Sequence, residues 1–400
     1  MRRFESVRAA ALPWAVGRVV VIGALALSRY LADHVHPAAA VVTRAHEGLL
    51  GWDAGYYRDL ALQGYAGLPR PAVRFFPLVP LVTRALHKVT GLSAGASLIG
   101  LVNVAALLAG VLLYRLVMTE TARRDLARRA VWILALAPSA FVLVMGYAEA
   151  VLLVLGIGAF LALRTHRWWW AAAAGYLAGL TRPIGLVLVL PALAEVALSL
   201  RSHPSDDPLP GQAGSSLRPA PLAHRPGTGA PDLRHAPLTH QLGAAAAVLA
   251  PLAGCFTFLG WVGARFGDFW LPLRVQESGN LRGRFSDPLV TVVHDAKDLF
   301  HGHVGTGLHV PWLAVFVVLL VVALRRWPLP YGLYALGVLA LAVSSANFDS
   351  LERYALSAFP FVLAGAGLVS GEETERTVFS ILGALLLAYS VLAFLNAVVP

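Results

Sequence analysis

The sequence is poor in charged residues, in lysine and in cysteine. Only 14% of its 400 residues are charged and 58% are hydrophobic, whereas a soluble domain has about 25% charged and about 45–50% apolar residues. Lys88 and Lys297 are the only lysines, and Cys255 is the only cysteine. An intramolecular disulfide is therefore impossible, and thiolate or Cys-based metal chemistry is not expected. The shortage of charge excludes an ordinary soluble enzyme, which could not cover its surface with polar groups.

Long apolar runs take the place of charge. Several extend over about 17–24 residues, enough to cross a hydrocarbon core of roughly 30 Å. Alternating apolar and polar runs are absent, which excludes an outer-membrane barrel. The sequence therefore predicts an all-α polytopic membrane protein with about eleven transmembrane helices. The expected spans are Leu12–Tyr30, Ser93–Val117, Val131–Met145, Ala150–Leu163, Trp168–Leu180, Ile184–Leu200, Leu242–Val262, Val310–Leu324, Pro330–Val343, Ala355–Val369 and Val378–Val399.

The N-terminus is basic and leads directly into the first span. This pattern occurs both in signal peptides and in retained first helices. The apolar part is long and no convincing cleavage site follows it. We therefore expect a retained helix that enters the membrane from a cytoplasmic N-terminus.

The formal net charge of +10 is by itself compatible with nucleic-acid binding. The arginines, however, gather in short clusters at the ends of the spans, where membrane topology explains them. The stretch Phe75–Val89 is apolar but contains Arg84, His87 and Lys88, so we expect an interfacial amphipathic helix there. Counting it as a span would place the arginines of residues 115–129 outside, against the positive-inside rule. The expected partner is the lipid bilayer, and no nucleic acid is expected.

Three long segments connect the spans of a single expected domain, residues 1–400. Residues 31–92 form the first extracytoplasmic loop, and residues 263–309 form the second. Residues 201–241 are rich in Pro, Gly, Ser and His. Because this composition cannot bury an apolar face, we expect the third segment to be a disordered cytoplasmic loop.

The first outer loop carries the most informative stretch, GWDAGYYRDLALQGY. Asp53 lies there between Trp52 and the pair Tyr56 and Tyr57. A partly desolvated carboxylate can accept a proton from an attacking hydroxyl, and aromatic faces can stack on a sugar ring. An interfacial aromatic belt explains the same Trp and Tyr residues without catalysis. Taken alone, the stretch leaves both interpretations open.

Three further charged residues fall at the expected outer face, where a charge is costly unless it is paired or faces water. Glu149 lies between two apolar runs, Arg182 lies beside a proline break, and Arg353 precedes Tyr354. An arginine fork matches phosphate oxygens, so both arginines are candidates for binding a phosphate. The ordinary alternatives are a hydrated loop carboxylate for Glu149, snorkelling for Arg182, and a local ion pair between Arg353 and the preceding glutamate.

The histidines His301, His303 and His309 suggest a metal site. Their segment is rich in glycine, and only Asp295 and Asp298 lie near enough in sequence to add ligands, so no metal site is expected. The sequence also has no P-loop, no GxGxxG at a strand–helix junction and no HExxH. Nucleotide and zinc-protease chemistry are therefore not supported, and no cofactor is expected.

Several segments together resemble the PIG-V-like mannosyltransferases, which are related to the GPI mannosyltransferase II enzymes of eukaryotes. The matching segments occur in the same order over most of the chain. They are Trp52-Asp53-Ala54 with Tyr56-Tyr57 and Gly64-Tyr65, Phe75-Phe76-Pro77-Leu78-Val79-Pro80, Tyr147-Ala148-Glu149-Ala150, Thr181-Arg182-Pro183-Ile184-Gly185, and Arg353-Tyr354 with Phe359-Pro360. Ala148 and Ala150 replace serines of the family, and Pro183-Ile184 replace Ser-Asn, so hydroxyl and amide donors are missing here.

The resemblance implies a GT-C fold whose large first extracytoplasmic loop carries interfacial helices. It implies a multi-span glycosyltransferase that uses a polyprenyl-phosphate sugar donor and has an extracytoplasmic active site. Our own expectation is an inverting mannosyltransferase of the cell membrane, with a lipid-linked glycan or protein acceptor. Asp53 takes the catalytic role by this resemblance, as the base. Arg182, with Arg353, is assigned to the donor phosphate. The residues expected to bind substrate are Trp52, Tyr56, Tyr57, Tyr147, Glu149, Arg182, Arg353 and Tyr354.

Two alternatives remain beside mannosyl transfer. A GT-C enzyme for another sugar, such as arabinose or glucose, needs the same base and phosphate-binding groups. A secondary transporter or lipid flippase is expected to show an internal repeat and charges at the membrane midplane. The hydropathy pattern has no such repeat, and the candidate residues gather at one face, so transport is less well supported.

Overall fold

Helices account for the regular secondary structure in the described part of the chain. The computed structural model describes residues 2–35, 43–201, 233–278, 282–301 and 307–398. Within these residues the strand-like pairing is limited to an isolated antiparallel bridge between Phe285 and Ser345. The all-α fold expected from the apolar runs is confirmed.

Six helical segments within the described residues are long and apolar enough to cross a membrane. Each coincides with an expected span. The other expected spans fall on shorter helices, so the total of about eleven stays a prediction. The six segments lie in α1 (Arg2–His34), α4 (Ala94–Thr121), η5 with α8 (Pro183–Leu188 and Val189–Arg201), α9 (Leu238–Phe266), α13 (His309–Arg326) and α17 (Glu372–Phe394).

Shorter elements fill the space between these helices and make up the described parts of the two segments expected to be outer loops. They are η1 (Ala45–Leu50), α2 (Asp53–Gln63), η2 (Tyr65–Gly67), η3 (Arg70–Arg74), α3 (Leu78–Thr90), α5 (Arg124–Leu136), η4 (Ala140–Leu143), α6 (Glu149–Arg164), α7 (Trp168–Gly179), α10 (Leu271–Arg274), η6 (Val275–Glu277), α11 (Pro288–Phe300), α14 (Leu329–Val343), α15 (Leu351–Ser357) and α16 (Pro360–Leu368).

Prolines decide where several helices end. The break expected at Pro183 is present, because α7 ends at Gly179 and η5 begins at Pro183. Two expected spans, Val131–Met145 and Ala355–Val369, were wrong as continuous helices. The first ends at Leu136, just before Pro138, and the second divides into α15 and α16 at Pro360. Proline lacks an amide hydrogen and clashes with the preceding turn, so neither helix continues through it.

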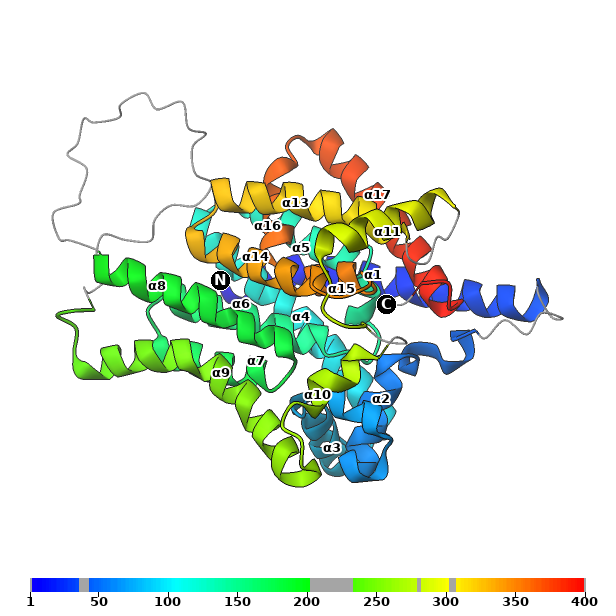
Figure 1. Ribbon diagram of the computed structural model, residues 1–400. Coiled ribbons are helices and arrows are strands. Elements are labelled where there is room, and N and C mark those ends of the chain that lie inside the picture. The colour runs from blue at the N-terminus through cyan, green and yellow to red at the C-terminus, as the bar shows by residue number, and fades with distance from the viewer. Residues whose placement is uncertain (1, 36–42, 202–232, 279–281, 302–306, 399–400) are drawn as a thin grey trace.

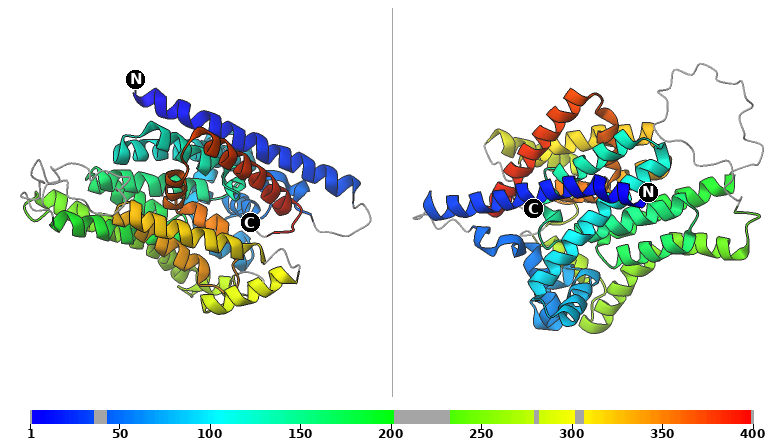
Figure 2. Two further views of the ribbon diagram at one scale, coloured as in Figure 1. Left: turned by 90° about the horizontal axis from the view of Figure 1, so that it is seen from above. Right: turned by 180° about the vertical axis from the view of Figure 1, so that it is seen from behind.

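Helices α8 and α13 run across Figure 1, whereas α17 descends steeply. The C-terminal end of α8 and the N-terminal end of α9 lie at the left of the view, and the C-terminal end of α1 lies at the right. Figure 2 shows α1 along one face of the bundle, next to α17. Helix α9 bends partway along its length in Figure 1. Pro251 lies inside it and accounts for the bend.

Helices α7 and α9 approach each other closely. A Cβ atom on Gly254 of α9 would lie 2.0 Å from the Tyr176 carbonyl oxygen of α7. One on Gly179 would lie 2.3 Å from the Pro251 carbonyl oxygen. Only glycine permits this contact between backbones, as in other tightly packed membrane helices. The contact holds the end of α7, and hence the following Arg182, against α9.

The segment expected to be the first outer loop contains α2 and α3, which lie together at the lower edge of Figure 1. Helix α3 occupies most of the stretch expected to be amphipathic. It buries Val79 and Thr83 and exposes Leu81 and Val89. Arg84 donates from Nε to the Ala61 carbonyl oxygen (2.6 Å) at the end of α2. An arginine there satisfies free carbonyl groups and binds α3 to α2.

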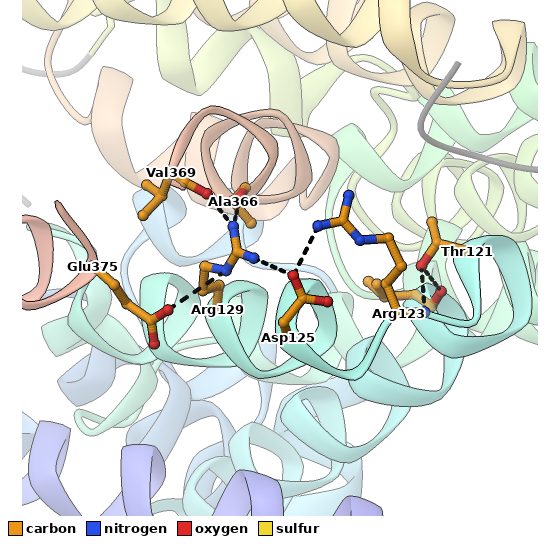
Figure 3. Close-up of polar contacts among 8 residues, drawn as sticks. Thr121, Arg123, Asp125, Arg129, Ala366, Val369 and Glu375 are labelled. Atoms are coloured by element: carbon orange, nitrogen blue, oxygen red, sulfur yellow. Dashed lines mark hydrogen bonds and ion pairs between the residues drawn. The ribbon is translucent and has the colours of Figure 1, made fainter. Parts of the chain in front are cut away.

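Arg129 joins three helices in the arginine-rich region expected to face the cytoplasm (Figure 3). Its Nη1 group donates to the carbonyl oxygens of Ala366 (3.4 Å) and Val369 at the end of α16. It also pairs with Asp125 one turn earlier on α5, and its Nε atom lies 3.6 Å from Glu375 Oε2 on α17. The cluster fixes α5, α16 and α17 relative to one another.

Parts of the expected loops lie outside the described residues. Residues 202–232 make up most of the 201–241 segment, so its predicted disorder lies outside them. In the first outer loop the same holds for residues 36–42, and in the second for residues 279–281 and 302–306.

Candidate active site

The candidate residues Asp53 and Arg353 stand at the start of two short helices. Helix α2 follows Trp52, which has φ 58° and ψ −131°, and α15 follows Ser350, which has φ 68° and ψ 17°. Such conformations cost about 1–3 kcal/mol in residues other than glycine, so the surroundings must hold them. The Trp52 indole donates to the Ala393 carbonyl oxygen at 3.0 Å and lies beneath the Arg44 guanidinium at 4.9 Å. These contacts fix the direction in which α2 presents Asp53.

Asp53 lies between two arginines. Its Oδ2 atom is 2.7 Å from Arg353 Nη1, and its Oδ1 atom is 3.3 Å from Arg74 Nη2. Burial alone would raise the pKa of the Asp53 carboxyl, but the charges of Arg353, Arg74 and Arg182 outweigh it and lower the pKa below its ordinary value. Asp53 is therefore ionised at neutral pH, with both oxygens bound by guanidinium groups.

Glu149 contacts both Arg182 and Arg353. Its side chain is fully buried at the first residue of α6. Its Oε1 atom contacts Arg182 Nη1 and lies 3.2 Å from Arg353 Nε. Arg353 thus bridges Asp53 and Glu149, which come from α2 and α6. The local alternative for Arg353 is wrong, since the preceding Glu352 faces His309 instead.

Tyr354 lies among three guanidinium groups. The Cζ atoms of Arg282, Arg182 and Arg353 are 4.5, 5.0 and 5.8 Å from the centre of its ring. Burial favours the neutral phenol, but these three positive charges prevail and lower the pKa of Tyr354 to about 7. Tyr147 lies beneath Arg353, at 5.3 Å. The two tyrosines hold the guanidinium planes by cation–π contacts.

A cavity of about 220 Å³ opens beside these groups. Four arginines but only two carboxylates line it, so a net positive charge remains even after Glu149 is counted. Most of the sequence-predicted residues are among its lining, but Glu149 and Tyr56 are not. Tyr56 stacks on Phe75 at 5.0 Å. The lining consists of Trp52, Asp53, Tyr57, Arg74, Phe75, Phe76, Tyr147, Arg182, Pro183, Gln276, Arg282, Asp349, Ser350, Arg353 and Tyr354.

Sequence reasoning missed Arg74, Arg282 and Asp349. Arg74 directly precedes the Phe75-Phe76-Pro77 motif. Its position beside that motif was the sequence feature that could have identified it as a candidate site residue. Arg282 belongs to the second outer loop, and its Nη2 atom donates to Ser345 Oγ at 3.0 Å. No spacing in the sequence relates that loop to Asp53. Only the folded chain brings the two together.

The two candidate histidines that the structure describes have different partners. His301 is exposed, and its ring contacts the Lys297 carbonyl group. His309 is fully buried against Glu352, and His303 lies outside the described residues. In the described part of the chain, one group of residues has the spacing of metal ligands, namely His294, Asp295 and Asp298 on α11.

The arrangement has the properties of an anion site with an ionised carboxylate at its centre. Guanidinium forks bind phosphate oxygens well, particularly where water is partly excluded. Asp53 adds a proton acceptor within the same cavity. The aromatic lining, with Trp52, Tyr57 and Phe75, offers apolar faces to a ring-shaped ligand.

No family model and no curated protein matches the chain. Among solved structures, the chain is similar to the crystal structure of an oligosaccharyltransferase from Archaeoglobus fulgidus. The two share 13% sequence identity, with a TM-score of 0.42. The similarity covers 93% of this chain and 53% of the archaeal one, so this chain spans about half the length of that protein.

Proposed function

We propose that the protein is a GT-C-type membrane glycosyltransferase. In this proposal it transfers mannose, with inversion, from a polyprenyl-phosphate donor to a lipid-linked glycan or protein acceptor. One observation carries the proposal. Asp53 lies between Arg353 and Arg74 in the wall of an arginine-rich cavity. The motif resemblance to PIG-V-like mannosyltransferases supports the choice of sugar and donor.

The reaction needs one base and one site for a leaving phosphate. The acceptor oxygen attacks the anomeric carbon, the bond from that carbon to the phosphate oxygen breaks, and Asp53 takes the hydroxyl proton. Polyprenyl phosphate leaves as an anion, so no strong general acid is required. Arg182, Arg353 and Arg74 stabilise the charge that develops on it.

Donor binding also prepares the base. In the free protein both oxygens of Asp53 are occupied by Arg353 and Arg74, which weakens the carboxylate as a proton acceptor. A phosphate competes for the same guanidinium groups. Binding of the donor therefore releases one oxygen of Asp53 toward the acceptor hydroxyl, and Asp53 is kept unreactive until then.

The remaining residues divide into two roles. Trp52, Tyr57 and Tyr147 line the cavity and contact the sugar or the acceptor. Glu149 is buried behind the arginines, so it positions Arg182 and Arg353 without touching substrate. In this proposal α3 lies in the membrane interface, where the lipid donor arrives, and its exposed apolar side chains Leu81 and Val89 support that position.

The proposed topology puts this site on the extracytoplasmic side of the cell membrane, with the N-terminus in the cytoplasm. The arginine clusters of the short loops, including Arg129, mark the cytoplasmic side by the positive-inside rule. The site lies at the other end of α6, the helix that runs from Glu149 to Arg164.

A transfer assay tests the proposal. Membranes containing the protein are incubated with radiolabelled polyprenyl-phosphate mannose, and in parallel with the glucose and arabinose donors, and the labelled product is identified. We expect product from the mannose donor with the wild type, and little with Asp53→Asn. Asp59→Asn, on the same helix and paired with Arg58, is the matched control. Equal labelling by wild type and Asp53→Asn would contradict the proposal, and transfer from another donor would change the sugar.

A further inference from the structure

Helix α11 of the second outer loop brings together three groups of the kind that bind metals. One imidazole nitrogen and two carboxylates, from His294, Asp295 and Asp298, have ligand atoms that all lie within 4.8 Å of one another. His294 and Asp298 are one helical turn apart, with Nε2 and Oδ2 separated by 3.9 Å. Residues at this spacing share a helix face and can chelate one ion.

Asp295 is buried without a full set of partners. The residue is only 2% exposed, and its Oδ2 atom has no hydrogen-bond partner among the described residues. A buried carboxylate that lacks a partner is strongly destabilising. A cation bound between its oxygen and the two neighbouring ligands would remove this cost.

A chain of contacting residues connects the region around Asp295 with the wall of the candidate active-site cavity. Helix α11, which carries Asp295, packs against α13, which begins at His309. The ring of His309 contacts Glu352 through Nδ1 at 2.9 Å, and its Nε2 atom lies 3.8 Å from Asp349 Oδ1. Asp349 lines the cavity, and Glu352 immediately precedes Arg353. An ion at α11 would therefore stabilise the wall from which Arg353 projects.

We propose that His294, Asp295 and Asp298 form a divalent-cation site on α11. The donor set of one imidazole nitrogen and two carboxylates suits a transition metal such as Zn²⁺ or Mn²⁺ better than Mg²⁺ or Ca²⁺, which prefer oxygen alone. Ligands of zinc lie about 2.0–2.2 Å from the ion, so small rotations of the exposed His294 bring the three groups into range. Water completes the coordination on the exposed side. The ion is structural and takes no part in sugar transfer.

Metal binding to the full chain tests this site directly. The protein is purified in detergent, freed of any affinity tag and stripped with a chelator. It is then dialysed against increasing Zn²⁺, and in a second series Mn²⁺, and the bound metal is measured by mass spectrometry. We expect one equivalent bound to the wild type. His294→Ala and Asp295→Asn should each bind at least about 10–100-fold more weakly, because the loss of an outer-shell partner alone costs that much. His301→Ala, near the end of the same helix and exposed, is the control and should bind as the wild type does.

The outcomes distinguish metal binding at these three residues from metal binding elsewhere on the chain. Size-exclusion profiles of all variants establish that each is folded. Binding that survives unchanged in both His294→Ala and Asp295→Asn overturns the proposal, as does a failure of the wild type to bind either metal. Because the measurement needs no substrate, it does not depend on whether the protein is a glycosyltransferase.

Discussion

Helix α6 has a cluster of buried charges at each end, and the two clusters are built differently. Glu149, its first residue, belongs to the cavity cluster with Asp53, Arg182 and Arg353. Arg164, its last residue, belongs to a second cluster. The helix has 16 residues, so the clusters are about 22 Å apart at a rise of about 1.5 Å per residue.

In the second cluster, each buried carboxylate is paired with the same arginine. Arg164 donates from Nε and Nη2 to the two oxygens of Glu120, at 2.7 and 3.2 Å, and from Nη1 to Glu195, at 2.8 Å. Glu120 and Glu195 are 1% and 3% exposed. One guanidinium is thus shared by two carboxylates, and all three of its nitrogens are engaged. This set of partners joins α4, α6 and α8.

The cavity cluster has the opposite balance. It has more arginines than carboxylates, and it faces an open volume of about 220 Å³. Trp52 and Ser350 have positive φ angles. They directly precede helix α2, which begins at Asp53, and helix α15, which carries Arg353. A closed set of ion pairs stabilises the fold, whereas an excess of one charge beside a cavity calls for a ligand of the other sign. We therefore propose that one end of α6 carries a structural cluster and the other end a functional one.

Asp53→Asn is expected to give the largest effect on activity. Loss of the base should lower kcat by about 10²–10⁴-fold, while the thermal unfolding temperature in detergent stays near the wild-type value. The transfer rate and the melting temperature are measured for the wild type, for Asp53→Asn and for the control Asp59→Asn. If Asp53→Asn retains its rate, or loses activity only because it unfolds, the distinction between the clusters fails.

Arg164→Leu should have the converse effect. It leaves the buried carboxylates of Glu120 and Glu195 without their partner, which should destabilise the protein by about 3–5 kcal/mol. Denaturant unfolding in detergent measures this loss. The exposed Arg167→Leu serves as the reference. The transfer activity per folded molecule of Arg164→Leu should equal that of the wild type. If this variant loses activity while its free energy of unfolding is unchanged, the Arg164 end of α6 has a functional role as well.

Substitution of Arg182 should affect the donor more than the acceptor. A charge-assisted hydrogen bond contributes about 1.5–3 kcal/mol, so Arg182→Ala should weaken donor affinity by about 10–100-fold. Arg182→Lys keeps the charge that balances Glu149 and should recover part of the loss. Steady-state KM values for both substrates test this. An increase confined to the acceptor KM would contradict the assignment to phosphate.

Tyr354→Phe should give the smallest effect, visible as a change in pH dependence. Below pH of about 7 the wild-type phenol is neutral and the nearby arginines keep their full charge. Above it the phenolate neutralises part of that charge, so donor affinity should fall as pH rises from 6 to 8, by up to about tenfold. The Phe variant should show a nearly flat profile. An identical pH profile in both proteins would show that Tyr354 does not titrate in this range.

Sequence reasoning identified most of the cavity but not how it is connected. Asp53, Arg182 and Arg353 were selected because charge at a membrane face needs an explanation, and all three line the cavity. Arg74 and Arg282 were missed, because an arginine in a hydrophilic loop is unremarkable until its partner is known. Glu149 was expected to meet substrate, whereas the fold buries it among the arginines.

The sequence by itself determined that the chain is helical and rich in apolar spans, and it indicated the break at Pro183, since hydropathy and backbone chemistry act over a few residues. It also indicated which charged residues lie at an expected membrane face, where a charge needs a partner or water. Only the tertiary structure decided which charges meet, as in the pair of Asp53 and Arg353, which are 300 positions apart. The reason is physical. An ion pair depends on distance in space, and in this chain that distance is set by the packing of helices remote in sequence.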